Sequence, residues 1–269
     1  MRNVLTAHIE GGEVSGTIDG ILRHSISKLA HVHFVSNSQA VKRLEQLGEN
    51  KNSIYKIGSP DIDLMFASHL PDLAKVLKRY EINFKNYAIL IFHPVTTEIK
   101  QISAQVEQLI EAIILSEENF IIIKSNNDLG CDIINNLFIK KLNGNKFKHL
   151  PSMRFEYFLT LLKNAKFIIG NSSAGIRESP YYGVPTINIG SRQHNRHNSD
   201  SIINVDPQST MILKAILNHS KLTRVPSSPF GDGNSSMRFL EILNGNSFWD
   251  TKTDKIFNDR FIQLFENEP

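Results

Sequence analysis

The chain has 269 residues, of which 41% are hydrophobic and 21% are charged, a composition typical of a globular protein with one large or two medium domains. Its formal net charge of +3 includes no basic block and gives no indication of nucleic-acid binding. No apolar run approaches the ~20 residues that span a bilayer, and the first residues lack the apolar core of a signal peptide. With Cys131 as its single cysteine, the chain is predicted to be cytoplasmic and to have no disulfide framework.

Strands that alternate with helices predict an α/β fold with parallel sheets covered on both faces. The first series has strands at residues 4–9, 32–35 and 54–57, and a helix from about Thr17. Apolar side chains recur along one face of that helix, at Ile18, Ile21, Leu22, Ile26 and Leu29. Three parallel strands bury too little to stand alone, so we expect this series to be the C-terminal half of a domain whose N-terminal half is missing. We assign it to residues 1–66, rejoined by a terminal helix over 250–269.

A second and fuller series occupies residues 67–249. Its strands are expected at residues 88–92, 120–123, 147–150, 167–169, 186–189 and 202–205, and helical patterns separate them. This number of strands predicts a complete, doubly wound domain.

The segment HIEGGEVSGTID at residues 8–19 places a carboxylate where ligands of open α/β sheets bind, because Glu10 directly follows a strand. Asp19 falls in the first turn of the next helix. Together the two acids could remove and return a proton, or they could only satisfy loop amides and cap the helix. Arg23 could pair with Asp19 or face an anionic substrate.

Two further strand ends carry polar groups. His93 ends an apolar strand and could donate to a phosphate oxygen, with a charge that follows phosphate binding, or could be structural. In GNSSAGIRE at residues 170–178, Ser172 and Ser173 precede a helix start that would present amides to a pyrophosphate, although they could be ordinary caps. Glu178 could accept from ribose hydroxyls.

Arg192 begins a cationic and polar loop, which we interpret as part of the phosphate site and not as a merely solvated loop. His194 and His197 lie close together, but no third ligand joins them at metal-binding spacing. We therefore predict no metal and no cofactor.

At these segments the sequence resembles the UDP-N-acetylglucosamine 2-epimerase family. The matching segments follow the family's order: HIEGGEVSGTID, LRH at 22–24, KLAH at 28–31, HPVTT at 93–97, GNSSAGIRE, GVPTINIGSRQ at 183–193 and GDGN at 231–234. The short GEVSGTID and NSSAG versions favour the hydrolysing branch, which serves the synthesis of sialic-acid-like sugars. The family also carries an earlier His-Gly-Asp-Arg-like segment that is absent here, so we expect an N-terminally truncated member.

The resemblance implies two Rossmann-like domains in a glycosyltransferase-like architecture, with the first domain incomplete. It implies that UDP leaves the sugar by elimination and that water then adds to the glycal, which yields N-acetylmannosamine from UDP-N-acetylglucosamine. Glu10 and Asp19 match acid/base positions of the family, and we also assign His93 a catalytic role, because it could stabilise the charge of the leaving diphosphate. The matching UDP-binding positions are His93, Asn126, Ser172, Ser173, Glu178 and Arg192, with the backbone of Leu150 at the uracil.

Two alternatives stay open at this point. The substrate could be UDP-N,N'-diacetylbacillosamine, because the same motifs serve both sugars. The chain could also be a truncated, inactive remnant that only binds UDP. A glycosyltransferase is less favoured because Glu10 and Asp19 lie in a proton-shuttling loop. We expect a homo-oligomer for a full-length member, with no nucleic-acid or membrane partner.

Overall fold

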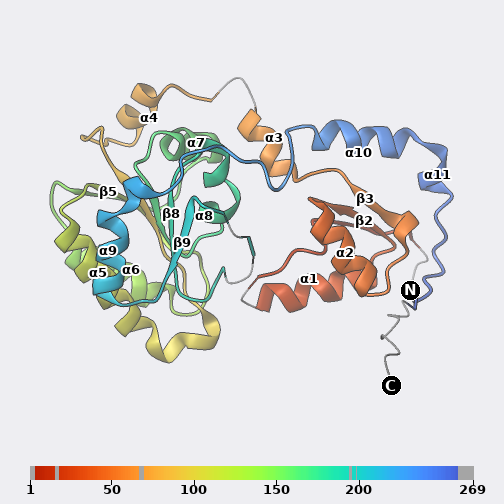
Figure 1. The fold of residues 1–269 in the computed structure, drawn as a ribbon, viewed down its shortest axis with the longest axis horizontal. Helices are drawn as coiled ribbons and strands as arrows, with labels where there is room; N and C mark the ends of the chain where they lie inside the picture. The colour runs from red at the N-terminus through yellow and green to blue at the C-terminus, as the bar shows by residue number, and fades with distance from the viewer. Residues whose placement is uncertain (1–3, 16–17, 67–69, 194–195, 198, 260–269) are drawn as a thin grey trace, which may run out of the picture. The chain divides into compact units, whose positions relative to one another are not determined.

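The computed structural model describes residues 4–15, 18–66, 70–193, 196–197 and 199–259. The chain divides into two compact units. Unit 1 contains residues 1–14, 18–63 and 230–269, and unit 2 contains residues 15–17 and 64–229. Each unit is an α/β structure with a parallel sheet (Figure 1). Gly16, which ends the loop of the first motif, and Thr17, where the first helix was predicted to begin, lie outside the described residues. His194 and residues 260–269 also lie outside them.

The sheet of unit 1 runs in the order β1-β2-β3, with β1 at Ala7–Ile9, β2 at Val32–Val35 and β3 at Ile54–Lys56. β1 begins three residues later than the predicted strand at residue 4. Helix α1 (Ile18–Leu29) connects β1 to β2, and α2 (Ser38–Gln46) connects β2 to β3. Both connections join parallel strands, so the carboxyl ends of all three strands meet at one edge of the sheet.

One face of this sheet is covered by a segment from the far end of the chain. Phe34 of β2 packs against Phe239 of α10 (Ser235–Asn244) and Phe248 of α11 (Asn246–Trp249), with ring centroids 4.7 and 6.0 Å apart. The Asp63 carboxylate accepts from the first amides of α10, Ser235 N at 3.0 Å and Ser236 N at 2.8 Å. Residues 230–249 therefore belong to unit 1, whereas the sequence pattern placed them with the second domain.

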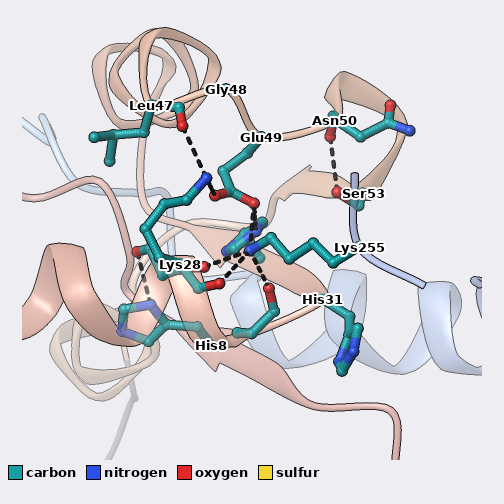
Figure 2. Close-up of polar contacts among 12 residues, drawn as sticks. His8, Lys28, His31, Leu47, Gly48, Glu49, Asn50, Ser53 and Lys255 are labelled. Atoms are coloured by element: carbon teal, nitrogen blue, oxygen red, sulfur yellow. Dashed lines mark hydrogen bonds and ion pairs between the residues drawn. The ribbon is translucent and has the colours of Figure 1, made fainter. Parts of the chain in front are cut away.

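A terminal helix was expected over residues 250–269. Of these, the structure describes residues 250–259, and they form no helix. This stretch instead brings an ammonium group to the C-terminal end of α1 (Figure 2). Lys255 Nζ donates to the main-chain oxygens of Ser27, Lys28 and Ala30 at 2.8, 2.9 and 2.6 Å. A cation at this position satisfies carbonyls that have no partner within the helix and complements the helix dipole.

The same ammonium group neutralises a buried carboxylate. Glu49, whose side chain is 1% exposed, pairs with Lys255 at 2.7 Å and with Lys28 at 2.8 Å (Figure 2). His33 Nε2 lies 2.9 Å from the same carboxylate, and burial lowers the His33 pKa to about 4 despite the neighbouring Glu49. Burial opposes ionisation of Glu49, but hydrogen bonds from Lys255 and Lys28 outweigh it and hold the Glu49 pKa below its ordinary value.

The apolar stripe expected on α1 does not face the sheet in this structure. The buried positions of α1 are Gly20 and Ser27, and Ser27 Oγ lies 3.0 Å from His8 Nδ1 on β1. The apolar side chains are exposed by 49 to 78%, at Ile18, Ile21, Leu22, Ile26 and Leu29. Small and polar side chains thus face β1. Hydrophobic periodicity had predicted that the opposite, apolar face of α1 would be buried.

The sheet of unit 2 runs in the order β6-β5-β4-β7-β8-β9, with all neighbours parallel. The strands are β4 Ala88–Ile91, β5 Phe120–Ile123, β6 Phe147–Leu150, β7 Ile168–Gly170, β8 Thr186–Ile189 and β9 Ile202–Val205. Each lies within one residue of its predicted bounds. The remaining elements of this unit are α4 Leu73–Arg79, η2 Thr96–Gln101, α5 Ile102–Ser116, α6 Cys131–Lys141, α7 Phe155–Lys163, α8 Ala174–Arg177, η3 Ser179–Tyr182, α9 Ser209–Leu217 and η4 His219–Lys221.

The core of unit 2 forms where α5, α6 and α9 cover one face of this sheet (Figure 1). Val106, Leu109 and Ile113 of α5 are fully buried against β4 and β5. Among the helices that the structure describes, none combines the length and the apolar character needed to cross a bilayer.

Replacement of Lys255 tests the link between the segment after α11 and α1. Lys255→Met should lower the free energy of unfolding by about 2 kcal/mol, because the buried Glu49 loses one of its two ammonium partners. Urea unfolding followed by the fluorescence of the only tryptophan, Trp249, measures this change.

Lys252→Met, which removes an exposed ammonium from the same segment, is the matched control and should change little. The Glu49 pKa is lowered, so its contribution is complete above the ordinary value of 4.5 and is lost as the pH falls through the folded-state pKa. The difference between Lys255→Met and the unaltered chain should shrink accordingly in acid. Equal stability of the two Met variants at neutral pH would contradict this account.

Candidate functional site

The strand order of unit 2 reverses between β4 and β7. From β4 the chain proceeds outward through β5 and β6, and from β7 it proceeds outward in the opposite direction through β8 and β9. In open α/β sheets, ligands bind beyond the carboxyl ends of the strands at such a reversal. His93 follows β4 and Asn171 follows β7, so both lie at this point.

Reciprocal hydrogen bonds join these two residues. His93 N donates to Asn171 Oδ1 at 2.7 Å, and Asn171 Nδ2 donates to His93 O at 2.8 Å. The close approach requires glycine at position 170, where φ is 129° and a Cβ would lie 1.9 Å from Ile91 O. Sequence reasoning included Asn171 in a motif but gave it no role; its position directly after a buried strand was the available signal.

The ring of His93 is held in one orientation by the next strand end. Asn126 N, after β5, lies 3.1 Å from His93 Nδ1 and donates to it. Burial, and then the charge of Arg192, lower the His93 pKa to about 4. His93 is therefore neutral near pH 7, with its proton on Nε2. In this state Nε2–H can donate a hydrogen bond, and a charge on His93 that follows phosphate binding stays a prediction.

Arg192 and its neighbour converge on the same residue. Arg192 Nη1 lies 3.4 Å from Asn171 O, and Gln193 Nε2 donates to the same oxygen at 3.0 Å. The positive charge of Arg192 is also the second cause, after burial, of the lowered His93 pKa. An anion at this strand edge would meet a guanidinium and a neutral imidazole N–H, which are suitable donors for a phosphate.

The serines of the third motif lead into a short helix. α8 covers only Ala174–Arg177, with Ser173 at its N-cap position, and Ser172 Oγ accepts from Ala174 N at 3.3 Å. The Ser172 hydroxyl therefore caps this turn. Glu178 is buried at the end of α8. The burial of Tyr182, and then the negative charge of Glu178, raise the Tyr182 pKa to about 12.

Asn126 and Leu150 occupy strand ends further out on the sheet. The Asn126 side chain donates to the Asp128 carboxylate, while its main-chain amide is used by His93. Leu150 ends β6, and its carbonyl accepts from Lys124 N at 2.9 Å. A cavity of 390 Å³ includes Leu150 and Lys124 in its lining.

Glu10, Asp19 and Arg23 belong to unit 1. Glu10 directly follows β1, has a φ of 66°, and its amide donates to Phe34 O at 2.8 Å. Burial, and then the positive charge of Arg23, lower the His8 pKa. The negative charge of Glu10 raises it, so Arg23 and Glu10 both act on the His8 imidazole. Arg23 Nη1 is buried without a hydrogen-bond partner among the described residues, and Asp19 is exposed in the first turn of α1.

Two residues of unit 1 to which sequence reasoning gave no role, Glu13 and Ser59, hold the loop after β1 and the Glu10 carboxylate in place. Glu13 is buried and accepts from Ser36 Oγ and from Asn37 Nδ2, which ties the loop after β1 to the end of β2. Ser59 Oγ contacts the Glu10 carboxylate directly. The structure thus brings Glu10 and Arg23 near His8, and brings His93, Asn126 and Arg192 around Asn171.

The largest of the cavities described is not at these residues. A cavity of 640 Å³ in unit 1 is lined by Glu49, Tyr55 and Lys255 among others, and none of the predicted site residues lines it. The predicted site residues of unit 2 gather instead at the strand ends around Asn171. Within the described residues, no group of three or more His, Cys, Asp or Glu side chains could hold a metal ion.

Comparison with known proteins gives a family for the chain. The model of the family described as UDP-N-acetylglucosamine 2-epimerase matches residues 1–244. A protein of Neisseria meningitidis serogroup B named UDP-N-acetylglucosamine 2-epimerase is 47% identical over 259 residues, which are 95% of this chain and 68% of the relative. A Legionella pneumophila protein named UDP-N,N'-diacetylbacillosamine 2-epimerase (hydrolyzing) is 32% identical over 245 residues, which are 90% of this chain and 64% of that protein.

Solved structures agree on the fold. The Methanocaldococcus jannaschii UDP-GlcNAc 2-epimerase, crystallised with UDP-GlcNAc and UDP, gives a TM-score of 0.74 at 21% identity, covering 88% of this chain and 68% of that chain. At this identity the likeness supports the fold alone. The chain spans about two thirds of the length of these relatives.

The protonation state of His93 is open to direct measurement. We expect long-range ¹H–¹⁵N spectra to show the Nε2–H tautomer from about pH 8 down to about pH 5, because burial holds the His93 pKa near 4. His93→Gln assigns the signal, and free histidine in the same buffer is the reference. A titration midpoint near the ordinary value of 6.5 would overturn the assignment of a neutral donor.

Proposed function

Since the chain belongs to the UDP-N-acetylglucosamine 2-epimerase family, we propose that it is a hydrolysing 2-epimerase of a UDP-2-acetamido sugar. The proposed substrate is UDP-N-acetylglucosamine, and the products are N-acetylmannosamine and UDP. One observation carries the proposal: Asn171, at the strand-order reversal of unit 2, is bonded to the main chain of His93 and lies 3.4 Å from the Arg192 guanidinium, so a neutral imidazole and a positive charge stand where a diphosphate would be received.

The proposed reaction has two halves. In the first, the proton on carbon 2 is removed and the bond from carbon 1 to the diphosphate oxygen breaks, so UDP leaves and a glycal forms. In the second, water supplies hydroxide to carbon 1 and a proton returns to carbon 2 from the opposite face. The configuration at carbon 2 is then inverted, and one water has been consumed.

The residues of unit 2 bind UDP in this proposal. His93 donates from Nε2 and Arg192 supplies positive charge, which stabilises the diphosphate as it leaves. Ser172 and Ser173 offer hydroxyls and amides to the same group. Asn126 orients His93, Glu178 accepts from the ribose, and the Leu150 backbone meets the uracil.

The residues of unit 1 carry the proton transfers. Glu10 and Asp19 are the acid/base pair, and Arg23 faces the anionic substrate as a cation. The proton on carbon 2 is only weakly acidic, so a carboxylate held in fixed geometry is needed to remove it. Glu10 has such a geometry, because its backbone amide is bonded to Phe34 O and its carboxylate contacts Ser59.

A second substrate has one specific observation in its favour. The Legionella relative acts, by its name, on UDP-N,N'-diacetylbacillosamine and is 32% identical. The higher identity to the Neisseria relative favours UDP-N-acetylglucosamine. We further propose that the enzyme acts in the cytoplasm as a homo-oligomer. The first point is supported by its one unpaired cysteine, Cys131.

The activity of the chain is tested by the release of UDP from each of the two UDP-sugars, measured with a coupled assay. Glu10→Gln and Asp19→Asn should each lower kcat by about 100-fold or more, because each removes an acid/base group and keeps its shape. Glu241→Gln, an exposed change on α10, is the matched control and should leave kcat unchanged. An active Glu10→Gln variant would refute the role of Glu10.

UDP affinity, measured by calorimetry on the full chain, tests the diphosphate site separately. Arg192→Gln should weaken UDP binding by about 10-fold or more, because a charged donor to the diphosphate is lost. Lys140→Gln, which removes an exposed charge from α6, should not change it. UDP binding with no release from either sugar would identify the alternative, a binding remnant. The absence of UDP binding would contradict both.

A further inference from the structure

One hydroxyl in unit 1 lies between two carboxylates. Ser59 Oγ contacts Glu10 Oε1 and also contacts Asp61 Oδ1. Ser59 is fully buried, at 0% exposure, and lies three residues after the end of β3, whereas Glu10 directly follows β1. Because parallel strands end at one edge, the fold brings these two side chains to the same place from 49 residues apart.

The main chain around Ser59 is fixed on both sides. The amides of Ile57 and Gly58 donate to Val35 O of β2 at 3.0 and 3.2 Å. Ser59 N donates to Phe230 O at 2.8 Å, and Ser59 O accepts from Ile62 N at 3.1 Å. The main chain of Ser59 is therefore fixed, and the rotation about Cα–Cβ places its hydroxyl against the two carboxylates.

Glu10 is fixed as firmly as its neighbour. Its φ of 66° lies in the left-handed region, which residues other than glycine seldom adopt and which costs roughly 1 kcal/mol. Its amide is bonded to Phe34 O, so the backbone is held in this conformation by β2. Such strain is retained where the surrounding structure determines the position of a side chain, and here it directs the carboxylate at Ser59.

The chemistry of a hydroxyl limits what Ser59 can do. It has one hydrogen to donate and lone pairs that can accept. With both acids ionised, it donates to one of them at a time. When Glu10 carries a proton, Ser59 can accept that proton's hydrogen bond and turn its own hydrogen toward Asp61. No bond of Ser59 breaks in this exchange; only the O–H direction changes.

We propose that Ser59 is a positioning residue for Glu10, and that by turning its hydrogen between Glu10 and Asp61 it stabilises the Glu10 carboxyl both before and after proton transfer. The inference rests on the proposed function, because it takes Glu10 as the group that exchanges a proton with the sugar. Asp61 is the second acceptor in this exchange, and it receives the Ser59 hydrogen when Glu10 is protonated.

Kinetics of the full chain separate this role from a structural one. Ser59→Ala should lower kcat for UDP release by about 10- to 100-fold, the factor expected for one lost hydrogen bond to a charged group. UDP affinity, a property of unit 2 in the proposal, should not change. Ser59→Thr keeps the hydroxyl and should restore kcat to within about threefold. Asp61→Ala should reduce kcat by about 10-fold, since only one of the two states loses its partner.

Ser38→Ala is the control, because it removes an exposed hydroxyl near the same edge of the sheet without contact to Glu10 in the described structure. Unchanged kcat in Ser59→Ala, together with an inactive Glu10→Gln variant, would overturn this inference and leave the proposed function intact. Full activity in Glu10→Gln would instead overturn the proposed function.

A readout that does not need turnover keeps the inference testable in a chain that releases no UDP. ¹³C spectra of the side-chain carboxyls, with Glu10 assigned by Glu10→Gln, should show its signal displaced in Ser59→Ala and returned in Ser59→Thr. Urea unfolding of both variants reports whether unit 1 is intact. A Glu10 signal that does not move in a folded Ser59→Ala variant would contradict the contact on which the inference rests.

Discussion

The reversal of strand order between β4 and β7 is the constraint on which the site of unit 2 depends. Two parallel strands whose connections leave in opposite directions open a crevice at their carboxyl ends, and the residues that follow them must line it. The pair of hydrogen bonds between His93 and Asn171 holds that crevice together. Further residues hold each member of this pair: Asn126 N bonds to the ring of His93, and Arg192 Nη1 lies beside the carbonyl of Asn171.

Unit 1 is organised by charge as much as by hydrophobic packing. At one edge of its sheet, Lys255 bonds to the end of α1 and neutralises Glu49 (Figure 2). At the opposite edge, Ser59 and Ser36 bond to the carboxylates of Glu10 and Glu13. A fixed α1 and a fixed loop are what proton transfer at carbon requires, because a weakly acidic proton is removed only by a base that is already in place.

Sequence reasoning was most successful where local pattern determines structure. The buried strands of unit 2 are continuous apolar runs, and their bounds were predicted to within one residue. Contacts between distant segments could not be predicted in this way. The place of residues 230–249 depends on the packing of Phe34 against Phe239, and the exposed face of α1 depends on the contact of His8 with Ser27. Burial and Arg192, which together keep His93 neutral, likewise have no signature in the segment HPVTT.

The central claim is that the carboxyl ends of β4 and β7 receive the diphosphate of UDP. Titration of the ¹⁵N-labelled chain with UDP, followed through its backbone amide signals, tests this claim most directly. The account predicts saturable shifts of the amide signals of His93, Asn126 and Ser172, with one dissociation constant. Shifts confined to the cavity of unit 1 that Glu49 and Lys255 line, or no shifts at all, would contradict it.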